Sequence, residues 1–428
     1  MWTDARAATA YGFWWLLLVT AGFLFLPRPG NGTNRLQFLS LPLILLIAAL
    51  VRILPAFWLP VGAGYDIESF KLVTDALLSG REVYTTVLGR HPYLPFQMYI
   101  MSAMAALAPA TGLPYVVAIK LPSILGDIAL TALIYRAILK RDRRVEMAAF
   151  LATLYALNPV SLLVTSYHGQ FEAVTLFLLA LAWYFWEFGP RIRASATSLG
   201  LAILNKTWPV VFLPIALIRL RDRRAQLAYL LLAVGIPVVA VITYLIVFNA
   251  DPLPMLRRAL THRGVAGYWG PGAVLFPAAD HLPVLQPLVN LLLQLKNWLL
   301  LGGLLFGLWF TRSQTALDAL LTLLLTLFVL TVGFGIQWLV WLVPFALLAG
   351  EDRWGKIYSL AAAFMLVIHL YGLHLYPWLG EWLTNPNLEW VIRLSALPAW
   401  VIALIWLIQR LRLASAQGTT AIWATEEG

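Results

Sequence analysis

The chain has 428 residues, of which 61% are hydrophobic and 12% are charged, and its formal net charge is +10. A soluble domain could not bury so much apolar surface, and apolar runs of about 18–25 residues recur along the chain. The composition therefore excludes a soluble globular protein and predicts an all-α polytopic membrane protein, with one integral membrane domain over residues 1–428. The sequence contains no cysteine, which excludes a disulfide framework and a thiolate metal site.

Basic residues gather in short stretches between the apolar segments. These stretches are LKRDRR (139–144), PRIR (190–193), RLRDRR (219–224) and DRWGK (352–356). Membrane proteins keep such stretches on the cytoplasmic side. Because apolar segments separate them, they do not form one basic face. This pattern excludes nucleic acid as the expected partner and indicates membrane lipids instead.

With the basic stretches placed inside, the sequence predicts about thirteen transmembrane helices, counting one short broken pair as two. The first lies within residues 1–36 and lacks a basic leading region, so it is interpreted as a retained span and not as a signal peptide. The predicted spans are 9–26, 37–59, 116–138, 146–166, 170–188, 198–220 (the broken pair), 226–248, 286–310, 315–332, 336–350, 356–375 and 391–410.

Residues 60–115 are predicted to form the first outer loop, which contains two helices. If the apolar segment 93–109 crossed the membrane, the next basic stretch would lie outside, so this segment is expected at the membrane surface. The other helix is expected near 66–79, with Asp66 as its N-cap and Gly80 as its terminator. A capping carboxylate stays ionised and can also accept a proton from a substrate hydroxyl, so capping and catalysis are compatible.

The segment 198–220 has basic stretches on both sides and is therefore expected to form two short helices. Pro209 favours a break between Asn205 and Pro209, since proline cannot continue the helical hydrogen bonds. Breaks of this kind occur where the backbone lines a cavity. Lys206, at the break, either extends to the interface or contacts a lipid phosphate.

The predicted outer turn SYHGQFEAV (166–174) carries His168, Gln170 and Glu172, which are more polar groups than a turn needs. Ionisable groups beside membrane spans favour a functional site, although a simple polar turn is the alternative. Asp127, in the outer half of its span, is expected to have a structural role, paired with Lys120 or with another helix.

The outer loop 249–283 departs from the positive-inside pattern, because Arg257, Arg258, His262 and Arg263 lie within seven residues. Arginine suits bidentate phosphate contacts, and attraction to anionic headgroups is the alternative. Gln337 and Trp338 mark a further outer turn, where tryptophan is also common as an interface anchor.

Seven short motifs follow one another in an order that characterises a known family. They are GYDIESF (64–70), ALLSGREVY (76–84), HPYLPFQMY (91–99), KLPSILGDIAL (120–130), GQFE (169–172), a K-x-x-P element (206–209) and QWLVW (337–341). Over roughly residues 40–350 the chain resembles the GT-C superfamily of polyprenyl-phosphate-sugar-dependent membrane glycosyltransferases. It is most similar to the mannosyl- and glucosyltransferase-like members.

The resemblance implies a GT-C fold with a helical first extracytoplasmic loop. It also implies inverting transfer of a hexose from a polyprenyl-phosphate sugar to an acceptor hydroxyl of a glycan, lipid-linked glycan or glycolipid, with Asp66 as the general base. The substrate-binding residues expected on this basis are Glu68, His91, His168, Gln170, Glu172, Lys206, Arg257, Arg258, His262, Arg263, Gln337 and Trp338. The chain has Asp66-Ile67-Glu68 where some mannosyltransferases have an Asp-x-Asp pair, which leaves a divalent metal at Asp66 and Glu68 open.

Other classes of protein remain alternatives. A lipid-linked-sugar flippase or transporter would place its ionisable groups near mid-bilayer, whereas here they gather on one side. An O-antigen ligase or polymerase-like enzyme would use outer arginine and histidine and would not need Asp66. A membrane scaffold without chemistry is the third alternative. The short loops favour a prokaryotic plasma membrane, with the site facing the extracytoplasmic side.

Overall fold

The computed structural model describes residues 5–30, 39–59, 62–189, 191–261, 264–370 and 385–423. In these residues the chain is almost entirely helical, with one two-stranded antiparallel strip. Seven described stretches are long and apolar enough to cross a membrane: Ala7–Phe25, Leu41–Trp58, Tyr115–Asp142, Val145–His168, Arg223–Phe248, Pro283–Phe310 and Glu389–Leu413. The described residues thus form an all-α protein with the character of an integral membrane protein.

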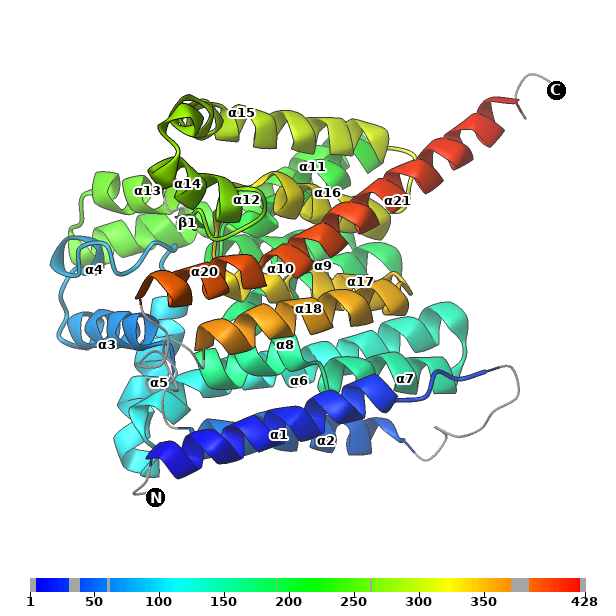
Figure 1. Ribbon diagram of the computed structural model, residues 1–428. Helices are drawn as coiled ribbons and strands as arrows, with labels where there is room; N and C mark the ends of the chain where they lie inside the picture. Colours follow the sequence, from blue (N-terminus) through cyan, green and yellow to red (C-terminus); the bar gives the residue numbers. More distant parts are fainter. Residues whose placement is uncertain are drawn as a thin grey trace.

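The first half of the chain builds one side of the helical bundle (Figure 1). Its elements are α1 (Ala5–Phe25), α2 (Leu41–Trp58), α6 (Tyr115–Asp142), α7 (Val145–Ala156), α8 (Pro159–Leu162), the π-helical turn η1 (Leu163–His168) and α9 (Glu172–Glu187). In the stretch from α7 to η1, 89% of the residues of its apolar 18-residue window are buried, which places it at the centre of the bundle. A helix that is apolar on all of its faces is typical of such a buried position.

The second half of the chain completes the bundle. Its elements are α10 (Ile192–Asn205), η2 (Trp208–Val211), α11 (Phe212–Arg219), α12 (Arg223–Phe248), α15 (Gln286–Phe310), α16 (Ala316–Leu330), α17 (Leu342–Leu348), α18 (Asp352–Leu370), α20 (Asn385–Ser395) and α21 (Leu397–Trp423). Only 6% of the residues in the apolar 18-residue window of the stretch that contains α15 are buried, and α15 packs mainly against α16. Most of its apolar surface is therefore left for lipid.

Shorter elements gather at one end of the bundle (Figure 1). They are α3 (Gly64–Leu78), α4 (Val83–Thr86), α5 (Gln97–Thr111), α13 (Pro252–Thr261), β1 (Val265–Ala266), α14 (Gly272–His281), η3 (Pro283–Leu285), β2 (Gly333–Phe334) and η4 (Ile336–Val340). The 28 residues of α6 span about 42 Å at 1.5 Å per residue, and the basic stretch 139–144 lies at the far end of that helix. The basic stretch 139–144 therefore lies at the end of α6 that is remote from the shorter elements.

Several local predictions are confirmed. The helix expected near 66–79 is α3, and Gly80 follows it with a positive φ of 69°, which suits glycine after a helix end. The helix expected at 93–109 is α5, which begins only at Gln97, after two prolines. The expected break after Asn205 is present, because α10 ends there and Lys206 is extended.

The strip of β1 and β2 joins two distant parts of the chain. Val265 pairs with Phe334, and Ala266 pairs with Gly333. Gly264 lies so close to the partner strand that a Cβ atom there would be 2.2 Å from the carbonyl carbon of Phe334. Glycine permits such an approach of two backbones. The strip therefore brings the middle of the 249–283 loop against the turn that carries Gln337 and Trp338.

Candidate functional site

Asp66 lies in the first turn of α3, and its carboxylate contacts the turn that precedes α9. Its Oδ2 accepts hydrogen bonds from His168 Nε2 at 2.9 Å and from Gln170 Nε2 at 2.8 Å. Among the described residues these are the hydrogen bonds of the carboxylate, so Oδ1 is left for a ligand. An ionised carboxylate only accepts hydrogen bonds, which places the histidine proton on Nε2.

The prediction that Asp66 is the N-cap of its helix is wrong. The N-cap is Ala63, and no side chain caps the helix. The amide of Ala63 donates to the carbonyl of His168 at 3.0 Å, and this contact turns the chain into the helix before Asp66 is reached. The carboxylate is therefore not bound to the amides of its own helix.

The turn that carries His168 and Gln170 is buried and tightly built. It begins at His168, the last residue of the π-helical turn η1, and such turns are frequent at functional sites. Gly169 has a φ of 87°, and Ser123 Oγ donates to the carbonyl of Gln170 at 2.8 Å. His168 and Gln170 are each 2% exposed. The side chains of His168 and Gln170 are thus held in fixed positions next to the Asp66 carboxylate.

The surroundings of Asp66 keep its carboxyl group ionised. Burial raises the pKa of Asp66, but the hydrogen bond and charge of His168, together with Gln170 and Lys206, lower it more. The pKa therefore lies below its ordinary value of 3.8. Asp66 is a carboxylate at neutral pH, with 30% of its side chain exposed.

Glu172 and Lys206 form a buried ion pair beside this group. Lys206 Nζ donates to Glu172 Oε1, and Trp341 Nε1 donates to Glu172 Oε2 at 2.8 Å. The same ammonium lies 4.3 Å from the ring centre of Phe171 and 4.8 Å from that of Tyr93. The helix break thus directs Lys206 inward to a charge partner, which excludes the alternative of a lysine extended to the interface.

Two cavities flank the strip of β1 and β2. The first, of about 430 Å³, is lined by Asp66 and His168 together with Tyr65, Tyr268, Gln337, His369 and neighbouring apolar residues; we call it the aspartate cavity. The second, of about 260 Å³, is lined by Lys206 and Lys296 together with Tyr93, Trp208, Asn297 and Trp341; we call it the lysine cavity. Gly264 and Trp338 line both, so the cavities are neighbours.

The other predicted site residues lie in different surroundings. Glu68 is 61% exposed and pairs with Arg90 at 3.4 Å. His91 is buried between the rings of Tyr84 and Tyr93, and burial lowers its pKa to about 4. Neither cavity is lined by the predicted residues Glu68 and His91 or by Arg90, the partner of Glu68.

The basic residues of the 249–283 loop are only partly described. Arg257 and Arg258 are exposed on α13 and do not line either cavity, and the Arg258 guanidinium lies against Gly89. His262 and Arg263 lie outside the described residues. The role of these four side chains as phosphate ligands stays a prediction.

The sequence leaves a divalent metal at Asp66 and Glu68 open. The two carboxylates have different partners, His168 for the first and Arg90 for the second. In the described part of the chain, no group of three or more His, Asp or Glu residues has the arrangement of a metal site.

Sequence reasoning missed Lys296 and, apart from Trp338, the aromatic lining of the two cavities. Lys296 lies in the middle of the predicted span 286–310, and a charged residue at such a position is a recognisable signal. Tyr65, Tyr268 and Trp341 carry no comparable signal, because aromatic residues are common throughout membrane proteins.

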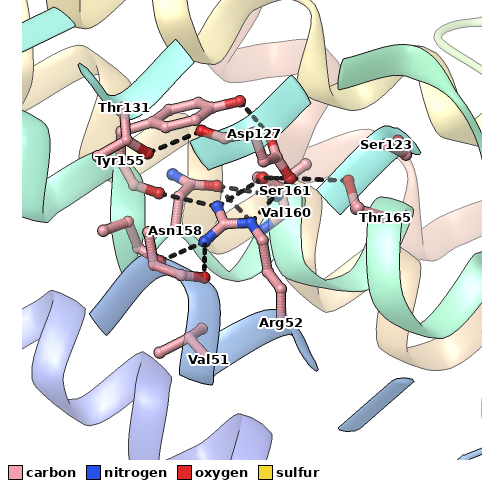
Figure 2. Close-up of polar contacts among 12 residues, drawn as sticks. Val51, Arg52, Ser123, Asp127, Thr131, Tyr155, Asn158, Val160, Ser161 and Thr165 are labelled. Carbon is pink, nitrogen blue, oxygen red and sulfur yellow. Dashed lines mark hydrogen bonds and ion pairs between the residues drawn. The ribbon is translucent and has the colours of Figure 1, made fainter. Parts of the chain in front are cut away.

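Asp127 belongs to a structural network and not to the candidate site (Figure 2). Its Oδ2 pairs with Arg52 Nε at 2.8 Å, and both side chains are fully buried. Hydroxyl groups of Tyr155, Ser161 and Thr165 also donate to the Asp127 carboxylate. The expectation of a structural role with another helix is confirmed, and the partner is Arg52 of α2.

The fold and the site together define an all-α protein of the integral membrane class, with a buried polar site at one end of its helical bundle. Neither a scan against models of known protein families nor a search of curated proteins finds a match.

Proposed function

We propose that the chain is an inverting glycosyltransferase that moves a hexose from a polyprenyl-phosphate sugar to an acceptor hydroxyl. The proposal includes a GT-C fold with about thirteen membrane helices and a site on the extracytoplasmic side of the membrane. One observation carries most of its support: a carboxylate, fixed by His168 and Gln170, lies in a cavity beside a second cavity that contains lysines.

In the proposed reaction, Asp66 is the general base. The acceptor oxygen forms a bond to the anomeric carbon of the donor while the bond from that carbon to the phosphate oxygen breaks. The leaving electron pair stays on polyprenyl phosphate, and the acceptor proton moves to Asp66 Oδ1. Because the pKa of this carboxylate is low, proton transfer becomes favourable only as the attacking oxygen gives up electron density to the new bond.

The lysine cavity suits the donor phosphate. Glu172 compensates the charge of Lys206, whereas Lys296 has no ion pair among the described residues. Lys296 belongs to α15, the helix with most of its surface left for lipid, so a polyprenyl chain can lie along this helix. Cations placed near the leaving phosphate stabilise the charge that develops on it.

The proposal is tested by supplying purified protein in liposomes with defined donors and mixed acceptors. Polyprenyl-phosphate hexoses should release polyprenyl phosphate in step with glycosylated product, whereas nucleotide sugars should not react. Movement of the intact donor across the membrane without release of polyprenyl phosphate would indicate a transporter and overturn the proposal.

The pH dependence of the transfer rate tests the role of His168. In the unaltered protein the Asp66 pKa lies below 3.8, so the base stays ionised as the pH falls from 8 to 5. Replacement of His168 by phenylalanine removes a hydrogen bond and a charge contribution that lower this pKa. We therefore expect the acid limb of the rate profile to move to higher pH.

The matched control is His281→Phe, at an exposed position of α14. It should leave the acid limb in place. An unchanged acid limb in His168→Phe would contradict the assignment of His168 as the residue that tunes Asp66.

A further inference from the structure

One face of α6 lies against the backbone of the turn between η1 and α9. Lys120 and Ser123, three residues apart, share this face of the helix. Lys120 Nζ donates to the carbonyl of Ser166 at 2.7 Å, and Ser123 Oγ donates to the carbonyl of Gln170 at 2.8 Å. The two residues are 1% and 2% exposed. Donors from α6 thus hold the backbone of the turn on either side of His168.

The ammonium group of Lys120 also contacts the end of α2, the helix that precedes α3. Its Nζ donates at 3.2 Å to the carbonyl of Leu59, the C-cap residue of α2. An ammonium group carries three N–H donors and no acceptor, so one lysine can bind several carbonyls at once. Lys120 therefore links the segment that leads to Asp66 with the segment that leads to His168.

The aliphatic stem of Lys120 packs against Gly169. A Cβ atom at Gly169 would lie 3.2 Å from Lys120 Cε and 3.1 Å from Ile67 Cδ1. The φ of 87° at Gly169 also suits glycine. The turn is therefore packed between α6 and α3, which leaves it little room to shift while the lysine stem is in place.

The orientation of the Asp66 carboxylate depends on this turn. No side chain caps α3, and the carboxylate accepts hydrogen bonds from His168 and Gln170. Hydrogen bonds weaken steeply as their distance and angle depart from the preferred geometry. A displaced turn would therefore release the carboxylate from its fixed orientation.

The attachment of α2 to α6 does not depend on Lys120 alone. About two helical turns further along α6, Asp127 pairs with Arg52 of α2 at 2.8 Å, and both side chains are fully buried. This ion pair joins the two helices independently of Lys120. Loss of the Lys120 hydrogen bonds is therefore expected to act mainly on the turn.

We infer that Lys120 and Ser123 are positioning residues, which hold the turn of His168 and Gln170 and thereby orient the Asp66 carboxylate. This inference rests on the proposed function, since it concerns the geometry of the proposed base. It gives Lys120 and Ser123 no contact with a substrate, because both are buried and neither lines a cavity.

The first test is the hydrogen bond from His168 to Asp66, observed without any substrate. The protein has six histidines, so NMR of 15N-histidine-labelled protein in lipid nanodiscs gives few ring signals. A hydrogen bond to a carboxylate shifts the Nε2 proton downfield, and the signal of His168 is assigned by its absence in His168→Phe. Lys120→Met keeps an aliphatic stem and removes the donors. We expect it to lose this downfield signal.

The second test is the rate of hexose transfer. In Lys120→Met, kcat should fall about 10²-fold, the effect of displacing a reacting group by about 1 Å. The KM for the donor should stay unchanged, because Lys120 does not line the lysine cavity. A role in stability alone would lower the amount of folded protein and leave kcat per folded molecule as it was.

The matched control is Lys140→Met, at the opposite end of α6. Lys140 also donates to a backbone carbonyl, that of Phe188, at 2.7 Å. This variant should keep both the His168 signal and kcat. Folded Lys120→Met with the downfield signal unchanged, or with that signal lost and kcat unchanged, would overturn the inference.

Ser123→Ala separates positioning from charge and from failure to fold. It removes one hydrogen bond to the turn without changing the charge of the protein. It should shift the His168 signal in the same direction and lower kcat by a smaller factor. If Lys120→Met yields no folded protein, an unchanged His168 signal in Ser123→Ala overturns the inference.

The outcome is distinguishable from failure of the proposed function. A His168 signal that depends on Lys120, in a protein that transfers no hexose, supports the positioning role and overturns only the transferase. Hexose transfer that is unaffected by both variants overturns the positioning role and leaves the transferase standing.

Discussion

Replacement of Asp66 by asparagine is expected to lower the rate of hexose transfer by about 10²–10⁴-fold, the usual contribution of a general base. Asparagine has nearly the same shape, and its amide oxygen can still accept hydrogen bonds from His168 and Gln170. It cannot take up the acceptor proton. Donor affinity should change little, because the lysine cavity that we assign to the donor does not include Asp66.

The matched control for this variant is Asp75→Asn, on the same helix but exposed and outside both cavities. Its transfer rate should equal that of the unaltered protein. Transfer by Asp66→Asn at the normal rate, with the normal amount of folded protein, would remove Asp66 from the role of base.

Replacement of Arg52 by methionine is expected to lower the free energy of unfolding by about 3–5 kcal/mol. This is the cost of leaving the fully buried Asp127 carboxylate without its charge partner. Arg52 also donates to the carbonyls of Ala48 and Ala156 and to Ser161 Oγ, so the same change leaves several buried acceptors with fewer partners. Reversible unfolding of the purified protein measures the loss.

Two comparisons make the Arg52 experiment specific. Arg224→Met, at an exposed position, should change the free energy of unfolding by less than about 0.5 kcal/mol. Adding Asp127→Asn to Arg52→Met should recover part of the loss, since no charge then stays buried alone. A change below about 1 kcal/mol in Arg52→Met would contradict a structural role for the pair.

The sequence was sufficient for features that depend on local patterns. Apolar length and basic stretches predicted a helical membrane protein, and Pro209 together with the flanking charges predicted the break beside Lys206. The clustering of His168, Gln170 and Glu172 in one short turn predicted a polar site. The structure brings two of these three side chains to Asp66, although the chain separates them from it by more than a hundred residues.

Features that depend on long-range packing were not predicted. The pairing of Arg52 with Asp127 joins α2 to α6, and no spacing rule connects positions 75 residues apart. The capping prediction for Asp66 failed for the same reason, because a contact between Ala63 and His168 decides where α3 begins. Both cavities are lined in part by residues of 264–268 and 333–338, two segments that the strip of β1 and β2 brings together.

The division of the polar residues between two cavities is a feature of the structure that the sequence did not indicate. Lys206 was expected to extend to the interface or to contact a lipid phosphate, yet in the structure it donates to Glu172, which also accepts a hydrogen bond from Trp341. This arrangement leaves Lys296 as the cation of the lysine cavity without an ion pair among the described residues. A signal for it was present in the sequence, as a lysine in the middle of an apolar span.

The most direct test of the proposed mechanism is the anomeric configuration of the product. The protein is incubated with a polyprenyl-phosphate hexose of known configuration, and the new glycosidic linkage is assigned by NMR. Direct attack by a hydroxyl activated by Asp66 predicts a product of inverted configuration, with one polyprenyl phosphate released for each sugar transferred. A product of retained configuration, or transfer without release of polyprenyl phosphate, would contradict the mechanism.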